Sequence, residues 1–326
     1  MFTFVTITYN HEKYIIDHLE SIRYQIENFS EGKKMNLIIS DDGSMDDTML
    51  FAQKWVERNR FLFSEVELLT SEKNQGIIKN YLRATAAIKT PAYKLLAGDD
   101  LYYKNNIFEI IEALKEKEII FTPALNFDGD TVWNSQDMNR LLTLKTPKQI
   151  KKVLKFQNPF NTPGAFYSTA LIQEDGLRAF ISKYTWIEDL PSYYYLFNKR
   201  PTIDYAVELK PYILYRSSVG ISTNKKNEKN DVFAIELDAM EKDLGMVLNK
   251  YPKYVNPYQY YWKLSKLKLK YRDSKTNPDI CTYNTILNDE AQKAQDFLAM
   301  LKTKSKEFLK SLDYSTPTTN LQEDNS

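Results

Sequence analysis

The chain has 326 residues, 43% of them hydrophobic and 27% charged, which is an ordinary globular composition with room for one large and one smaller domain. The 44 Lys and Arg nearly balance the 43 Asp and Glu, and a net charge of +1 excludes an overall field that would draw the protein to nucleic acid. A single cysteine, Cys281, excludes an internal disulfide framework and fits a reducing compartment.

The first hundred residues alternate between strand and helix patterns. Short apolar runs predict strands at 2–8, 37–40, 66–70 and 93–97. Apolar residues at helical spacing predict helices that begin near Ile15, Met49 and Ile77, and Asp46 or Asp47 can cap the second of them. Such alternation predicts right-handed βαβ units and a mostly parallel sheet. Ligands of such sheets bind at the carboxyl ends of the strands, so the polar residues there are the candidates for chemistry.

From residue 118 onward the pattern is less regular. Shorter strand patterns follow at 119–121, 165–168 and 202–207. Beyond about residue 231 the sequence is nearly all helical and rich in lysine, and residues 315–326 are polar with no apolar face. We therefore expect an α/β domain over 1–225, a helical C-terminal extension over 226–314 and a disordered tail.

The distribution of apolar residues along the chain also indicates a cellular compartment. Residues 1–10 lack the basic start and long apolar stretch of a signal peptide. Nowhere do about eighteen apolar residues follow one another, which is the rough minimum for a membrane span. These features favour a cytoplasmic protein.

Polar clusters follow three of the predicted strands. They are Thr8-Tyr9-Asn10, Asp41-Asp42-Gly43-Ser44 with Asp46-Asp47, and Gly98-Asp99-Asp100. In the third cluster two adjacent carboxylates repel each other unless a cation or hydrogen bonds offset the repulsion. A divalent metal bound there can bridge the phosphates of a nucleotide diphosphate and neutralise the leaving group. The alternative is a solvated turn whose Asp caps a helix over 107–114.

The other clusters also have two interpretations each. Asp-Gly is a common turn dipeptide, but the carboxylate of Asp41 can instead accept the imide N–H of a pyrimidine base. Asn74-Gln75-Gly76 leads into a helix that carries Lys79. A helix N-terminus and a lysine both attract phosphate, although a surface lysine is the alternative.

Read in order, these motifs resemble the family-2 GT-A glycosyltransferases, which build bacterial capsules, lipopolysaccharide and related glycans. The resemblance is best over residues 1–115, where four motifs have the expected order and spacing. Thinner similarities follow, in Asn161-Thr162-Pro163-Gly164, in Trp186-Ile187-Glu188-Asp189, and in Tyr215-Arg216 with Gly220 and Ser222. The resemblance implies a GT-A fold and inverting transfer of a hexose-type sugar. The donor would be a nucleotide diphosphate sugar, with UDP favoured, and the acceptor a hydroxyl of a glycan or lipid-linked molecule.

The resemblance also implies roles for individual residues. Tyr9 and Asp41 would hold the base and ribose with help from the backbone near Thr8, and Arg216 would contact phosphate. Asp99 would touch the ribose or the metal.

In the same comparison Asp100 would ligate Mn²⁺ or Mg²⁺ directly, and Asp189 would take the proton of the acceptor hydroxyl. Many relatives have an Asp-x-Asp-Asp string where this chain has Ala97-Gly98-Asp99-Asp100, and often a histidine ligand in a late loop. Here the histidines are His11 and His18, near the first motif. The metal would therefore be held mainly by the diphosphate and water.

Asp189 makes chemical sense by itself, because Glu188 and burial can raise its pKa toward that of a general base. The alternative is an acid favoured by the dipole of a helix over 190–197.

The segment 258–275 interleaves aromatic residues with lysines. It can lie on the inner face of an anionic membrane, pack on the catalytic domain, or join two copies of the chain.

Two other functions compete with sugar transfer. A nucleotidyltransferase would need a glycine-rich phosphate loop after the first strand, which Thr8-Tyr9-Asn10-His11 does not supply. A nucleotide-sugar-binding module without turnover is the non-enzymatic alternative.

Overall fold

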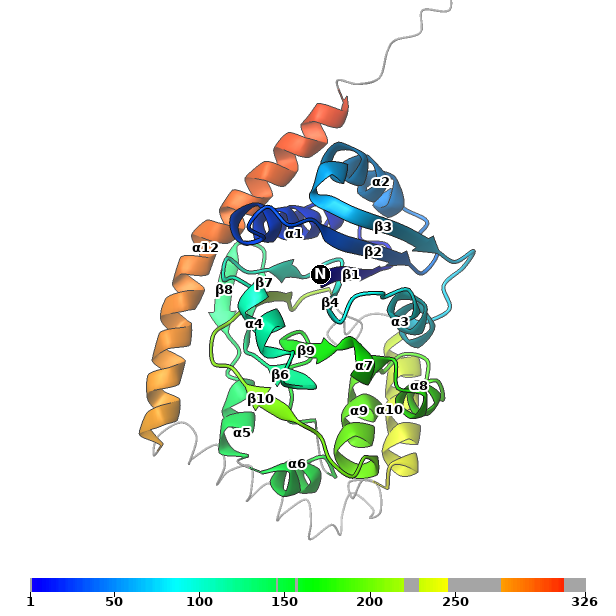
Figure 1. Ribbon diagram of the computed structural model, residues 1–326, viewed down its shortest axis with the longest axis vertical. Helices are drawn as coiled ribbons and strands as arrows, with labels where there is room; N and C mark the ends of the chain where they lie inside the picture. The colour runs from blue at the N-terminus through cyan, green and yellow to red at the C-terminus, as the bar shows by residue number, and fades with distance from the viewer. Residues whose placement is uncertain (1, 145, 156–157, 220–228, 246–276, 314–326) are drawn as a thin grey trace, which may run out of the picture.

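A seven-stranded sheet forms the centre of the protein (Figure 1), whose computed structural model describes residues 2–144, 146–155, 158–219, 229–245 and 277–313. The strand order is β10-β6-β9-β4-β1-β2-β3. The strands are β1 (Phe2–Thr8), β2 (Met35–Asp41), β3 (Phe63–Thr70), β4 (Ala92–Ala97), β6 (Ile119–Phe121), β9 (Ala165–Ser168) and β10 (Tyr205–Val207). β9 runs antiparallel to β4 and β6, and the other neighbouring pairs are parallel. The predicted α/β fold with a mostly parallel sheet is confirmed.

Helices cover both faces of this sheet. Those of the first half are α1 (Ile15–Phe29), α2 (Thr48–Asn59), α3 (Ile77–Ala86) and α4 (Phe108–Ala113). Those that follow are α5 (Met138–Thr143), α6 (Pro147–Val153), α7 (Thr169–Ile172), α8 (Asp175–Ile181) and α9 (Asp189–Tyr194). Side chains of β1 alternate between two cores, because successive residues of a strand point to opposite faces. Phe4 packs with α1, α2 and α4, whereas Val5 packs with α3, α8 and α9.

A second, four-stranded sheet has the order β5-β11-β7-β8. Its strands are β5 (Leu101–Tyr102), β7 (Ala124–Asp128), β8 (Thr131–Asn134) and β11 (Ile213–Arg216). Sequence patterns did not predict these strands, because each is short and β11 pairs with partners about a hundred residues earlier. This sheet matters for the site because β5 follows Asp100 directly and β11 ends at Arg216.

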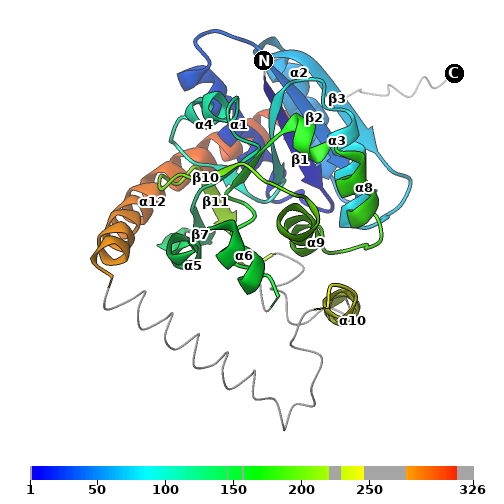
Figure 2. The same ribbon diagram turned by 60° about the horizontal axis from the view of Figure 1, so that its bottom comes forward.

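Two helices of the C-terminal region are described, α10 (Lys229–Asp243) and α12 (Pro278–Asp313). They lie on opposite sides of the molecule (Figures 1 and 2). α12 runs along α1 and β8, where Phe297 packs edge-on against Tyr24 at 4.9 Å and Lys302 donates to the main-chain oxygen of Gly129 at 2.7 Å. No helix in the described ranges is long and apolar enough to cross a membrane. The segments 258–275 and 315–326 lie outside the described residues.

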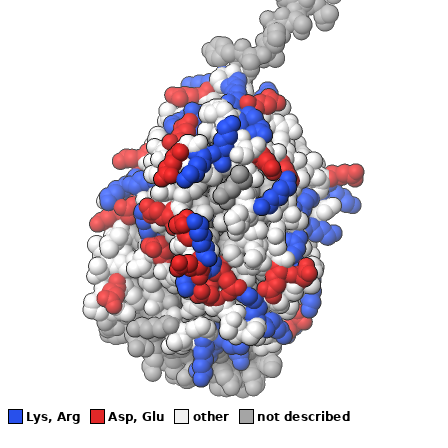
Figure 3. Space-filling view, viewed as in Figure 1, with Lys and Arg blue, Asp and Glu red and all other residues white. Residues whose placement is uncertain are grey.

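Acidic and basic side chains are interspersed over the face of the molecule seen in Figure 3. This mixture accords with the near-zero net charge of the sequence. Charged ligands would therefore be bound by local groups, as the sequence indicates.

Candidate active site

The carboxyl ends of three neighbouring parallel strands meet at one edge of the large sheet. In its register Thr8 of β1 lies beside Asp41 of β2, and Ile7 lies beside Ala97 of β4. The polar motifs that follow these strands are therefore neighbours in space.

The loops that follow β1 and β2 are joined by reciprocal hydrogen bonds. The N–H of Asn10 donates to Oγ of Ser44 at 2.8 Å, and the N–H of Met45 donates to Oδ1 of Asn10 at 2.9 Å. The N–H of His11 donates to Oγ1 of Thr48 at 2.7 Å. Asn10 has a φ of 55°, a left-handed conformation that asparagine tolerates better than most residues. The first two motifs thus form one connected unit.

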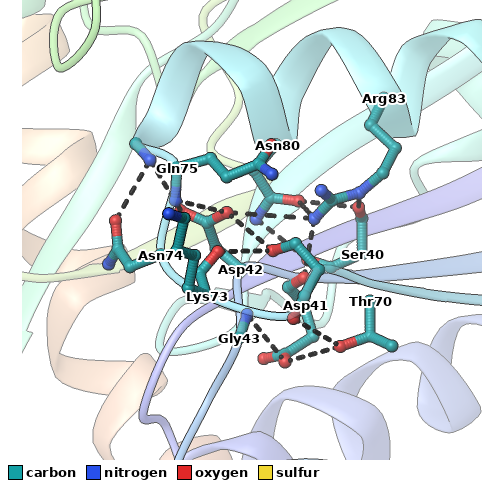
Figure 4. A network of polar contacts seen from close by, with 12 residues as sticks. Ser40, Asp41, Asp42, Gly43, Thr70, Lys73, Asn74, Gln75, Asn80 and Arg83 are labelled. Atoms are coloured by element: carbon teal, nitrogen blue, oxygen red, sulfur yellow. Dashed lines mark hydrogen bonds and ion pairs between the residues drawn. The ribbon is translucent and has the colours of Figure 1, made fainter.

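The carboxylate of Asp41 is used by its own turn (Figure 4). Its Oδ2 accepts the N–H of Gly43 at 3.1 Å, the N–H of Ser44 at 2.9 Å and the hydroxyl of Thr70 at 3.3 Å. Gly43 has a φ of 76°, and a Cβ there would lie 2.7 Å from the carbonyl carbon of Lys73. These contacts of Asp41 are those of a turn residue, which is one of the two interpretations that the sequence leaves open.

Asp42 ties the end of β2 to the Asn74-Gln75-Gly76 motif (Figure 4). Its carboxylate accepts the N–H of Gln75 at 3.1 Å, the N–H of Gly76 at 2.9 Å and the hydroxyl of Ser71 at 3.1 Å. Sequence patterns do not point to this role of Asp42. The residues next to Asp42 in the chain cannot reveal it, because the hydrogen-bond donors to Asp42 lie about thirty residues later.

Asp99 and Asp100 are buried, with 7% and 4% of their surface exposed. The alternative of a solvated turn is therefore wrong. Neither residue caps a helix over 107–114, since Oδ1 of Asn106 accepts the N–H of Phe108 at the start of α4. The acid pair instead lies between β4 and the short strand β5.

Arg216 supports this acid pair from the second sheet. Its N–H donates to Oδ1 of Asp100 at 2.8 Å, and its Nε donates to the main-chain oxygen of Asp99 at 2.9 Å. The guanidinium group is buried over the rings of Tyr14 and Phe127, at 4.3 and 4.4 Å from their centres. Burial, and next the charge of Asp99, hold the pKa of Asp100 well above its usual range. A bound cation would offset both effects.

His18 is a second support that sequence analysis missed. Its Nδ1 lies 2.7 Å from the main-chain oxygen of Asp100, and its Nε2 lies 2.8 Å from Oγ1 of Thr6. Burial lowers the pKa of His18 to about 4, so the ring is neutral at pH 7. A carbonyl can only accept, so Nδ1 carries the proton and Nε2 accepts from the threonine hydroxyl. The ring therefore holds the backbone of the acid pair.

A cleft of about 420 Å³ opens beside the acid pair. It is lined by Ile7, Ile77, Leu95, Leu96, Ala97, Asp99, Asp100, Asp137, Phe160, Asn161, Thr162, Pro163, Trp186, Ile187, Glu188, Asp189, Tyr215 and Phe233. Three of the predicted site residues, Asp99, Asp100 and Asp189, are thus brought to one cavity, although 88 residues or more separate the pair from Asp189 in the chain.

Asp189 is the first residue of α9, and hydrogen bonds hold its carboxylate in place. Oδ2 accepts from Nδ2 of Asn158 at 3.0 Å and from Oγ1 of Thr162 at 3.2 Å, while Oδ1 accepts the N–H of Leu190 at 2.6 Å. Burial raises the pKa of Asp189, and these donors partly oppose the shift by favouring the ionised form. These hydrogen bonds fix the orientation of the side chain at the edge of the cleft.

Glu188, its neighbour, has a different environment. Burial, and next the charge of Asp189, raise the pKa of Glu188 to about 8. At pH 7 Glu188 is therefore mainly protonated, and the hydrogen bonds around Asp189 favour ionisation of Asp189 over Glu188.

Lys94 of β4 supports the loop of Thr162 and Pro163, which lines the cleft. Its Nζ donates to the main-chain oxygens of Pro163 at 2.6 Å and Ala165 at 2.7 Å. Burial lowers the pKa of Lys94 to about 7. The lysine holds the loop that carries Thr162, a hydrogen-bond partner of Asp189, and sequence patterns gave no signal for this role.

Five of the predicted site residues are absent from the lining of the cleft as described. They are Thr8, Tyr9, Asp41, Lys79 and Arg216. Thr8 and Asp41 are buried at the strand ends, Tyr9 is half-buried, and Lys79 is exposed on the first turn of α3. Oγ1 of Thr8 is buried without a hydrogen-bond partner in the described part of the chain.

The acid pair fits a divalent cation. Asp99 has no hydrogen bond to its carboxylate among the described residues, and Asp99 borders the cleft. Asp100 retains Oδ2, since its bond from Arg216 uses Oδ1. Carboxylate oxygens suit Mg²⁺ and Mn²⁺. Within the described ranges no group of three or more His, Cys, Asp or Glu gathers as a metal site, so such a cation would need further ligands from a diphosphate or water.

Replacing Glu188 by glutamine should stabilise the protein at high pH. The folded protein keeps a proton on Glu188 up to a pKa of about 8, whereas the unfolded chain loses it near 4.5. The resulting stabilisation is complete below the unfolded pKa and is lost as the pH rises through the folded one. Because Gln does not titrate, the melting temperature of Glu188→Gln relative to wild type should climb by a few degrees between about pH 5 and pH 9.

The exposed Glu116→Gln is the matched control, and its melting temperature should keep a constant difference from wild type across this range. A constant difference for Glu188→Gln as well would contradict the assigned pKa.

Comparison with known proteins gives the family. The sequence profile of glycosyl transferase family 2 matches residues 3–179, more than half of the chain. No curated protein sequence matches this chain. The crystal structure of S. aureus TarS with UDP-GlcNAc is similar in fold, with a TM-score of 0.53 and 16% identity over 96% of this chain and 90% of that one. The complex of TarS with UDP has a TM-score of 0.50 and 19% identity over 90% of each chain. The chain belongs to glycosyl transferase family 2, and its α/β architecture with a mostly parallel sheet is the GT-A fold of a glycosyltransferase.

Proposed function

We propose that the protein transfers a hexose-type sugar from a UDP-sugar to a hydroxyl of a glycan or lipid-linked acceptor, with inversion at the anomeric carbon. The reaction would serve surface polysaccharide synthesis on the cytoplasmic side of the membrane. One observation carries the proposal: a single cleft is bordered by the Asp99–Asp100 pair and by the ordered carboxylate of Asp189. The similarity in fold to TarS, solved with UDP and with UDP-GlcNAc, supports the choice of donor.

Asp99 and Asp100 would hold a Mn²⁺ or Mg²⁺ ion. When bound, this ion neutralises the charge that develops on the diphosphate leaving group. Of the two acids, Asp99 is the more available ligand, because Asp100 also receives the N–H of Arg216. Arg216 and His18 would keep the pair in position rather than touch the donor.

Asp189 would accept the proton of the acceptor hydroxyl. Asn158, Thr162 and the N–H of Leu190 orient its carboxylate and favour its ionised form. A base at a different wall of the cleft from the leaving group permits in-line displacement at the anomeric carbon, and such displacement inverts the configuration. Glu188, neutral at pH 7, would leave the negative charge to Asp189.

The nucleoside would lie over the ends of β1 and β2. Tyr9, which is half-buried, would contact it directly, with help from the backbone near Thr8, whose side chain is buried. Asp41 would act mainly by shaping the adjoining turn. Lys79, exposed on α3, would meet only the phosphate end of a bound donor.

Release of UDP from UDP-GlcNAc tests this function. We expect slow hydrolysis that requires MnCl₂ or MgCl₂ and stops with EDTA, and it should accelerate when a suitable glycan acceptor is added. A panel of other UDP-sugars, scored first by thermal shift, identifies the preferred donor. Metal-dependent binding of a UDP-sugar without any UDP release would indicate a binding module instead of an enzyme.

A further inference from the structure

Glu236 of α10 grips the backbone just before the candidate base. Its Oε1 accepts the N–H groups of Thr185 at 3.0 Å, Trp186 at 2.7 Å and Ile187 at 3.2 Å. Its Oε2 accepts the N–H of Thr185 at 3.0 Å as well. One carboxylate therefore satisfies three successive main-chain donors, an arrangement in which converging N–H dipoles bind an anion.

The same loop is held on its other side by α3. The main-chain oxygen of Thr185 accepts the N–H of Ile78 at 3.1 Å. Gly76, with a φ of 95°, packs so closely that a Cβ would lie 2.6 Å from Cγ2 and 2.8 Å from the oxygen of Thr185. Asp42 in turn fixes the N–H of Gly76. The loop is thus clamped between α10 and a segment that is anchored at the strand ends.

Helix α10 also forms part of the site itself. Phe233, one turn before Glu236, lines the cleft together with Trp186 and Glu188. At the other end of the helix, Oδ2 of Asp243 accepts the hydroxyl of Tyr184 at 2.7 Å. Helix α10 therefore binds Tyr184 through Asp243 and residues 185–187 through Glu236. This stretch immediately precedes Glu188 and Asp189.

Loss of the Glu236 carboxylate would free this loop. Three main-chain N–H groups would lose their partner at once, and each would need water or a new conformation to satisfy it. Asp189 follows Ile187 by two residues, so a displaced loop would move the start of α9. A displacement of about 1 Å at a reacting group can cost roughly a hundredfold in rate.

We propose that Glu236 is a positioning residue of this glycosyltransferase. It holds the loop Thr185–Ile187 so that Asp189 faces the cleft, and it couples α10 to the reaction without touching the donor. The inference rests on the proposed role of Asp189 as the base.

Three variants of the full chain test this role. Glu236→Ala removes the acceptor, whereas Glu236→Gln keeps one oxygen that can still accept. Asp238→Asn is the matched control, because Asp238 is an exposed carboxylate on the same helix that pairs with Lys242. Amide hydrogen exchange at 185–187, UDP affinity and metal-dependent UDP release from UDP-GlcNAc are measured for each, with melting temperatures to verify folding.

For Glu236→Ala we expect exchange at 185–187 to accelerate at least about tenfold. Its kcat should fall roughly tenfold to a hundredfold while the Kd for UDP changes less than about twofold. Glu236→Gln should lie between Glu236→Ala and wild type, and Asp238→Asn should match wild type in all three measurements.

Unchanged exchange at 185–187 in Glu236→Ala would show that Glu236 does not hold the loop. Faster exchange with a kcat equal to that of Asp238→Asn would overturn the positioning role. If wild type itself releases no UDP from any UDP-sugar, the proposed function fails, and the exchange experiment still decides whether Glu236 holds the loop.

Discussion

Replacing Asp189 by asparagine should lower the rate of sugar transfer by roughly a hundredfold to ten-thousandfold, the usual contribution of a general base. Asparagine fills the same space, and its single amide oxygen can still accept from Asn158 and Thr162 in the place of Oδ2, so the fold of the site should persist. It cannot take a proton. UDP release from UDP-GlcNAc, with and without acceptor, measures the loss, and the affinity for UDP should change less than about twofold.

Asp137→Asn is the control for this experiment, because Asp137 lines the same cleft but has no part in the proposed proton transfer. It should keep a rate close to that of wild type. The wild-type rate should also rise with pH as Asp189 loses its proton, at a pKa that burial has raised. An Asp189→Asn variant with wild-type turnover would remove Asp189 from the reaction and with it the inverting mechanism proposed above.

Replacing Asp99 by asparagine should weaken metal-dependent donor binding by roughly tenfold to a hundredfold, since a neutral amide is a much poorer ligand for a divalent cation than a carboxylate. Asp99 borders the cleft, and its side chain is not used in hydrogen bonds within the described ranges. Titration of UDP in the presence of MnCl₂ and of EDTA gives the difference in affinity that the metal confers.

Asp47→Asn controls for the loss of one negative charge near the same edge of the sheet. Its side chain is exposed and lies outside the lining of the cleft. It should show the wild-type gain in affinity on adding Mn²⁺. The same gain in Asp99→Asn would show that Asp99 is not a ligand, and Asp100→Asn would then be the decisive variant.

Asp189 and Asp99 are both among the site residues that sequence patterns predict. The difference between Asp99 and its neighbour Asp100, however, comes from the fold. The sequence places Asp99 and Asp100 together at a strand end and does not distinguish them. The register of β11 presents the N–H of Arg216 to Asp100, and this contact leaves Asp99 as the freer carboxylate. Likewise, neighbours in sequence cannot reveal that Asp42 binds Gly76 or that His18 holds the backbone of Asp100.

By itself the sequence determined the α/β class, the strands β1 to β4 with the helices between them, and the resemblance to family-2 glycosyltransferases. These features are local, since hydrophobic periodicity and strand-end motifs are read within short windows. Only the tertiary structure decided which acids share a cleft, which of them are ordered, and which distant residues hold them. The contacts of Arg216, Lys94 and Glu236 join residues about 50 to 117 positions apart. Such pairings arise from the packing of the two sheets and of α10, which no short window of sequence encodes.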